Sequence, residues 1–181
     1  MAGDREEAGA TLADIAGVER RTKEFLTYAK VSESFTLWGT VWFLGYGLTH
    51  FVPKHAGTIW LILNSLGIAG SFALAALARR RSGSPFRPQI PAILLTFIVF
   101  GFLWTYLGRM GWREQAAFWP TFFSFALIVF GAWAGRALVL AGAVLTLLTM
   151  AGYIWSGAYY DLWMAVVGGG ALVGLGVWLR R

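Results

Sequence analysis

Residues 57–81 read GTIWLILNSLGIAGSFALAALARRR. No charged side chain occurs from Gly57 to Ala78, and three arginines follow directly. An α-helix rises about 1.5 Å per residue, so about 20 apolar residues cross a hydrocarbon layer of about 30 Å. This segment is therefore long enough to span a membrane, with Arg79–Arg81 held in the water at one end.

Five other segments of the chain have the same apolar character. The chain of 181 residues is 57% hydrophobic and only 13% charged, with a mean hydropathy of +0.61. A typical soluble domain carries about 25% charged residues. We therefore expect an all-α integral membrane protein, with a six-helix transmembrane bundle over residues 34–181 and a separate cytoplasmic element over residues 1–33. The six predicted spans are 34–53, 57–78, 91–108, 116–135, 137–155 and 162–179.

Basic residues gather beside alternate ends of these spans. Of the 15 Lys and Arg residues, all except Lys54, Arg109 and Arg113 flank the ends on the N-terminal side of the membrane. Short cytoplasmic loops are enriched in Lys and Arg, so we expect both termini and the 79–87 loop to lie in the cytoplasm. The membrane is expected to be a bacterial-type inner (plasma) membrane. No continuous basic stripe accompanies the net charge of +6, so nucleic-acid binding is not predicted. The first thirty residues lack the apolar core of a removable signal peptide.

Trp and Arg residues recur at the ends of alternate predicted spans. The second, fourth and sixth spans begin near Trp60, Trp119 and Trp163, and each ends at an arginine. This pattern suits three tandem helical hairpins, although the rules of membrane topology alone would also produce it.

An amphipathic stripe precedes the first span. Its residues are spaced by three and four, which places them on one face of a helix while charged residues fill the other faces. The stripe could dock a cytoplasmic partner helix, pair with a second copy of the chain, or lie on the inner leaflet. It consists of Ile15, Val18, Thr22, Phe25 and Ala29.

Residues that carry chemistry are scarce. Asp, Glu, Lys and Arg are absent from all six predicted spans, although ion-coupled transporters ordinarily hold at least one such residue there. The chain has no cysteine, no Ser/His/Asp arrangement and no metal motif, so we predict no enzyme activity, no cofactor and no metal. His50 and His55 are close in sequence, which is poor geometry for a haem held between two helices. An interfacial His50 in contact with water or headgroups is the simpler interpretation.

Polar side chains near the membrane concentrate in the outer half. Asn64 is predicted to hydrogen-bond a neighbouring helix, because an amide in hydrocarbon needs a partner. The functional alternative is an outward-facing ligand pocket. That pocket would be lined by His50, Asn64, Tyr106, Trp155, Tyr160 and Asp161.

Glycine is abundant, with 23 residues. Small residues one helical turn apart let two helix backbones approach closely within a membrane. Three such pairs are predicted to pack helices together: Gly131 with Gly135, Gly170 with Gly174, and Gly67 with Ser71.

Two functions fit these features best. The first is a non-enzymatic membrane protein that acts as a subunit, assembly factor or regulator through contact with lipid and with another membrane or cytoplasmic protein, or with its own copy. The alternative is a small-molecule permease or substrate-binding subunit that uses the outward pocket. A haem or metal protein is a third, which an absorption spectrum would test.

Overall fold

The computed structural model describes residues 32–82 and 88–179, and within these ranges the chain is helical with short connections and no strand. The first helix covers residues 32–51 and is called helix 32–51 below. A short turn, η1 (Pro53–His55), leads into α2 (Ala56–Ser82). There follow α3 (Gln89–Leu107), α4 (Trp112–Ala134) and α5 (Arg136–Trp155). The last segment comprises η2 (Gly157–Tyr159), α6 (Tyr160–Trp163), the π-helical η3 (Met164–Gly169) and α7 (Gly170–Trp178).

The six long helical segments agree in number with the six predicted spans. Four described helices are long and apolar enough to cross a membrane: Pro53–Arg80, Trp112–Ala134, Arg136–Trp155 and Gly157–Trp178. The apolar part of α3, Pro91–Leu107, is shorter. The stripe from Ile15 to Ala29 lies outside the described residues.

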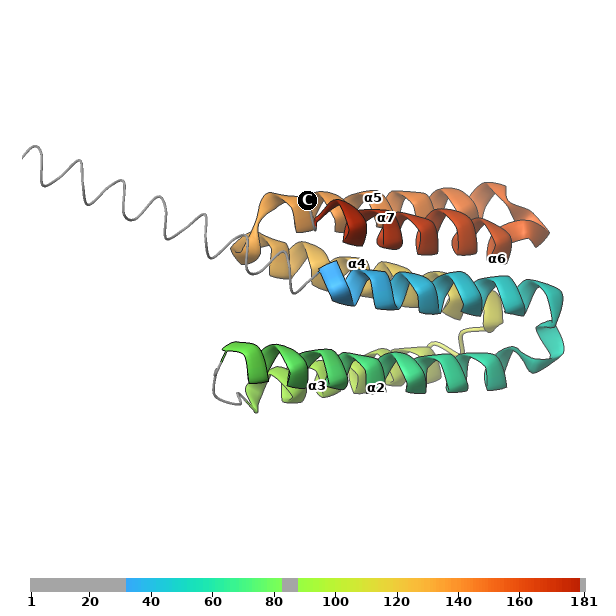
Figure 1. Cartoon of the computed structure of the whole chain (residues 1–181). Coiled ribbons are helices and arrows are strands. Elements are labelled where there is room, and N and C mark those ends of the chain that lie inside the picture. The colour runs from blue at the N-terminus through green and yellow to red at the C-terminus, as the bar shows by residue number, and fades with distance from the viewer. Residues whose placement is uncertain (1–31, 83–87, 180–181) are drawn as a thin grey trace, which may run out of the picture.

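The helices form three layers. In Figure 1, α5 and α7 form the upper layer, helix 32–51 and α4 the middle one, and α2 and α3 the lower one. Successive helices run antiparallel (Figure 1). Helix 32–51 packs against α2, α3 against α4, and α5 against the last helical segment, as a hairpin arrangement requires. The α4–α5 pair, which joins two of the predicted hairpins, is also closely packed, so the hairpins are not separate units.

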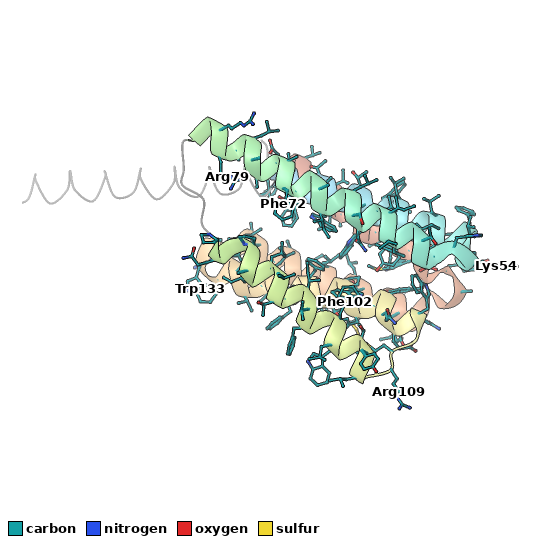
Figure 2. All side chains as sticks on the ribbon, turned by 90° about the horizontal axis from the view of Figure 1, so that it is seen from below. Lys54, Phe72, Arg79, Phe102, Arg109 and Trp133 are labelled. Atoms are coloured by element: carbon teal, nitrogen blue, oxygen red, sulfur yellow. The ribbon has the colours of Figure 1, made fainter. Side chains whose placement is uncertain are left out.

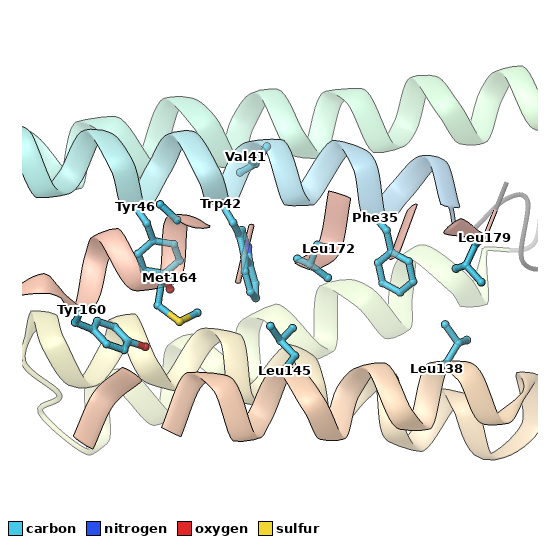
Figure 3. Packing of buried hydrophobic residues seen from close by; sticks show 11 residues of the cluster. Phe35, Val41, Trp42, Tyr46, Leu138, Leu145, Tyr160, Met164, Leu172 and Leu179 are labelled. Atoms are coloured by element: carbon cyan, nitrogen blue, oxygen red, sulfur yellow. The ribbon is translucent and has the colours of Figure 1, made fainter. Parts of the chain in front are cut away.

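The buried apolar cluster occupies the upper two layers. Its members come from helix 32–51, α5 and the α6–α7 segment, while half-buried residues of α4 pack against it. Figure 3 shows Phe35 and Trp42 of helix 32–51 facing Leu138 and Leu145 of α5, with Met164 between the layers. From α2 only the half-buried Trp60 and Leu63 pack against this cluster, and no described residue of α3 takes part in it.

Helix 32–51 and the last helical segment approach each other at their backbones. A Cβ at Gly39 would lie 2.7 Å from the Val173 nitrogen, and a Cβ at Gly169 would lie 2.7 Å from the Phe43 nitrogen. Farther along the same pair, the Ser32 hydroxyl donates to the Gly176 carbonyl at 2.6 Å. Of these contact residues, Gly169 ends the π-helical turn η3, while Val173 and Gly176 belong to α7.

The glycines predicted to pack helices take different roles. Gly131 packs against α5, where its Cβ would lie 2.7 Å from the Val139 nitrogen. Gly135 instead makes the turn between α4 and α5, because its φ of 142° is a conformation that side chains other than glycine rarely adopt. Gly170 and Gly174 face open space among the described residues, and Gly169 and Gly176 make the close approach in their place.

The lower layer is attached through smaller contacts. Gly67 of α2 lies against the Trp38 ring, and the Trp38 indole N–H donates to the Ser71 hydroxyl at 3.1 Å. On the other side of the layer, Gly101 of α3 lies against Trp119 of α4. Large apolar side chains on both helices stay exposed, including Phe72 and Phe102, which Figure 2 labels.

Candidate functional site

The molecule has two chemically different ends. Figure 2 places Lys54 and Arg109 at one end, called the Lys54 end below, and Arg79 and Trp133 at the opposite end. Because the helices alternate in direction, the Arg136 turn between α4 and α5 also lies at the Arg79 end. The Lys54 end carries two acidic residues, Glu114 and Asp161, together with Lys54, Arg109 and Arg113, whereas Glu33 is the one acidic residue described at the Arg79 end.

The Lys54 end is organised around one carbonyl group. In an α-helix the carbonyl of residue i accepts the N–H of residue i+4, but residue i+4 of Ala116 is Pro120, which has no N–H. The Ala116 carbonyl accepts two tyrosine hydroxyls instead, from Tyr46 at 2.7 Å and from Tyr160 at 3.2 Å. This three-way contact, called the Ala116 junction below, ties helix 32–51, α4 and α6 together at a single atom.

The predicted fourth span begins at Ala116, and a helix that began there would have Pro120 in its first turn. The helix itself begins earlier, at Trp112, so Pro120 lies about two turns inside α4. The first turn of α4 is polar and was excluded by a criterion that measures apolar length alone. Glu114 lies in this first turn, where its negative charge favours the helix N-terminus.

A pocket of about 390 Å³ borders the Ala116 junction. The Arg113 guanidinium is fixed on one wall, where it donates to the Tyr153 carbonyl at 2.9 Å and lies 5.0 Å from the centre of the Tyr153 ring. Tyr160, which is only 3% exposed, closes the floor. The lining residues are Trp112, Arg113, Ala116, Gly157, Ala158, Tyr160 and Asp161.

Two opposite charges line this pocket without neutralising each other. Arg113 and Asp161 both contribute to its wall, yet no ion pair within 4.0 Å joins them. Asp161 is half-buried and interacts electrostatically with His50. The His50 ring lies 6.0 Å from the Tyr159 ring and 5.3 Å from the Phe51 ring, measured between centroids.

The six side chains of the predicted outward pocket do not converge as one lining. Tyr160 and Asp161 line the observed pocket, and His50 lies beside it. Asn64 is half-buried on α2, and Tyr106 is 81% exposed on α3. Trp155 is 79% exposed and borders a second, smaller hollow of about 160 Å³.

Five of the seven lining residues were not among the predicted pocket residues: Trp112, Arg113, Ala116, Gly157 and Ala158. Arg113 and Trp112 were assigned to a connection, and Ala116 has no reactive side chain. Pro120 was the available signal, because a proline within a helix frees the carbonyl four residues earlier for another donor.

The described residues contain no group of three His, Cys, Asp or Glu side chains that could hold a metal ion. Comparison of the chain with protein-family models, curated proteins and solved structures finds no match.

Proposed function

We propose that the chain is a multi-pass membrane protein that acts through contact, as a subunit, assembly factor or regulatory partner, and not through catalysis. The observation that carries this proposal is the division between a filled core and two peripheral helices. Apart from their contacts to helix 32–51 and α4, α2 and α3 carry large exposed apolar side chains along their length. Such surfaces suit lipid tails or the helix of another membrane protein.

The filled core supports contact over permeation. Trp42, Tyr46 and Met164 are buried where helix 32–51 meets the last helical segment, and the backbones touch at Gly39 and Gly169. The pocket at the Lys54 end favours the alternative of a substrate-binding subunit or permease. However, its floor is closed by the Ala116 junction, so transport through the bundle would require that junction to open.

Helix 32–51 supports a regulatory role. It follows the amphipathic stripe Ile15–Ala29 in sequence, and it contacts α2 through Trp38, α4 through Tyr46 and α7 through Gly39. A protein bound to the stripe would therefore be connected directly to the helix with which three others pack. In this proposal both termini lie in the cytoplasm, and the Lys54 end faces the outer side of an inner (plasma) membrane.

Membrane insertion and orientation are tested first. The chain expressed in bacteria should remain in the membrane pellet after extraction at alkaline pH. Reporter domains fused after residue 82 and after residue 181 should be active only as cytoplasmic reporters. A chain released by alkaline extraction, or a residue-82 fusion active on the outer side, would contradict the proposed insertion.

Partner contact is tested with the full chain. The paired substitutions Val18→Glu and Phe25→Glu place charges on the stripe, while Glu19→Gln and Lys23→Gln change other faces of the same segment. After crosslinking in cells, the stripe variant should lose a crosslinked protein that the control variant retains, with both variants still in the membrane. If the crosslinked species is the chain itself, the contact is self-association. If neither variant changes the crosslinking pattern, the contact proposal fails.

A further inference from the structure

We propose that the pocket at the Lys54 end binds a zwitterion carrying a primary ammonium group and a phosphate, the chemistry of a phosphoethanolamine headgroup. This inference rests on the proposed membrane placement, since it puts the pocket at the outer headgroup level. It does not depend on the identity of any protein partner. A lipid headgroup and a free soluble solute share this chemistry, and the experiment separates them.

The two charged side chains of the pocket suit a ligand that carries both charges. Arg113 and Asp161 line the same hollow without forming an ion pair. A ligand with one positive and one negative group satisfies both at once, whereas a ligand of a single charge would leave one of them opposed. Paired charges of opposite sign are stabilised when their partners are complementary and partly removed from water.

Arg113 is suited to a phosphate group. Its guanidinium has five N–H donors, and one of its terminal nitrogens is committed to the Tyr153 carbonyl at 2.9 Å. That bond, together with the contact to the Tyr153 ring, fixes the direction of the side chain. The remaining donors form the kind of planar fork that binds two phosphate oxygens.

Asp161 is suited to an ammonium group that carries hydrogens. A carboxylate accepts N–H donors, and a primary ammonium offers three of them, whereas a quaternary ammonium offers none. Quaternary ammonium groups are usually held by several aromatic faces. Of the two aromatic residues that line the pocket, Tyr160 is 3% exposed and bonded to Ala116, which leaves Trp112 as the open ring. The pocket therefore favours ethanolamine over choline.

The size and position of the pocket fit a headgroup. Its volume of about 390 Å³ is near the lower end of the range for small-ligand sites, roughly 300–1,000 Å³. Trp112 is half-exposed at its rim, and tryptophan favours the headgroup region because its ring is apolar and its N–H is polar.

The experiment uses the purified full chain in detergent micelles, with bound lipids counted by native mass spectrometry. Phosphatidylethanolamine, phosphatidylcholine and phosphatidylglycerol are added in matched amounts. Phosphatidylethanolamine should bind about tenfold more tightly than the other two, as expected for one charge-assisted contact. Glycerophosphoethanolamine, titrated by calorimetry, separates the sources: its binding at the same affinity indicates a free solute, and a large loss without acyl chains indicates a lipid.

Variants assign the contacts. Asp161→Asn should abolish the preference for ethanolamine over choline, because it removes the charge that the ammonium group contacts. Arg113→Gln should weaken the binding of phosphatidylethanolamine and of phosphatidylcholine about tenfold, because both headgroups carry the phosphate that Arg113 would contact. Arg109→Gln and Glu114→Gln lie at the same end outside the lining and should leave binding unchanged. Thermal melting identifies variants that have lost their fold.

The proposal is overturned if the unmodified chain binds ethanolamine and choline lipids equally, or if Asp161→Asn keeps the preference. These results are distinct from failure of the proposed function. That failure would appear as extraction of the chain from membranes, before any lipid is added.

Discussion

The Ala116 junction leads to a quantitative prediction. The substitutions Tyr46→Phe and Tyr160→Phe each remove one hydroxyl from the Ala116 carbonyl, while the other hydroxyl remains. A net hydrogen bond contributes about 1 kcal/mol. The bond from Tyr160 is the longer one, at 3.2 Å, so its loss should cost roughly 0.5 kcal/mol and that from Tyr46 about 1 kcal/mol.

The double variant should cost more than this sum. It leaves a partly buried carbonyl with no donor, because Pro120 supplies no N–H. The penalty for an unsatisfied buried acceptor is roughly 1–3 kcal/mol, and the lower end applies because Ala116 also lines the pocket, where water can enter. We expect a total loss of about 2.5 kcal/mol, with a coupling energy of about 1 kcal/mol between the two hydroxyls.

Pro120→Ala supplies the missing donor and completes the cycle. In the unmodified chain its effect combines the loss of a buried ring with a gain in helix propensity. Those terms are the same in the double tyrosine variant, where the new N–H also satisfies the carbonyl. Pro120→Ala should therefore be more favourable in the double variant by about 1–2 kcal/mol.

The assay is reversible unfolding in mixed micelles, in which a denaturing detergent is titrated and the fluorescence of the ten tryptophans is followed. Stabilities are compared at one detergent composition. The reasoning is refuted if the two tyrosine substitutions are additive, or if Pro120→Ala has the same effect in both backgrounds. Either result would show that another group satisfies the carbonyl.

Three further predictions concern packing and placement. Gly169→Ala should destabilise the bundle by about 1–3 kcal/mol because the new methyl group would meet the neighbouring backbone, whereas Gly170→Ala, which meets open space, should be neutral or stabilising by up to about 1 kcal/mol in the same unfolding assay. Trp163→Phe should cost about 1–3 kcal/mol, because it removes the hydrogen bond from the indole N–H to the Leu148 carbonyl (2.9 Å) and the smaller ring leaves part of the indole's space unfilled. A melting temperature equal to that of the unmodified chain would contradict this prediction. Replacing Arg79–Arg81 with three glutamines should increase the fraction of chains in which a reporter fused after residue 82 reaches the outer side, and an unchanged ratio would show that other charges set the orientation.

The sequence predicts the helices better than it predicts the site. Apolar length located six segments, and Gly135 divides the fourth from the fifth because its positive φ ends α4. Hydropathy does not detect the polar first turn of α4, since Trp112–Gln115 resembles a connection by composition. Without that first turn, the position of Pro120 inside the helix could not be predicted.

The direction of each side chain around its helix was the harder problem. Depth in a membrane can be inferred from charges and tryptophans, but two residues at one depth can face opposite sides of a helix. Tyr106 and Trp155, for example, are 81% and 79% exposed, and neither lines the pocket. The face that each helix buries depends on which helices pack together. The close approach of helix 32–51 to α7 cannot be predicted from either segment alone.

That close approach has a consequence for biosynthesis. The bond between Ser32 and Gly176 joins residues that are 144 positions apart, and the glycine contacts beside it also link the earliest described helix to the last. A ribosome would release helix 32–51 long before its main partner exists, so the glycine-lined face must wait in the translocon or in lipid until the final segment emerges. Truncated products that end before residue 160 would keep that face uncovered, which would make them targets for membrane quality-control proteases.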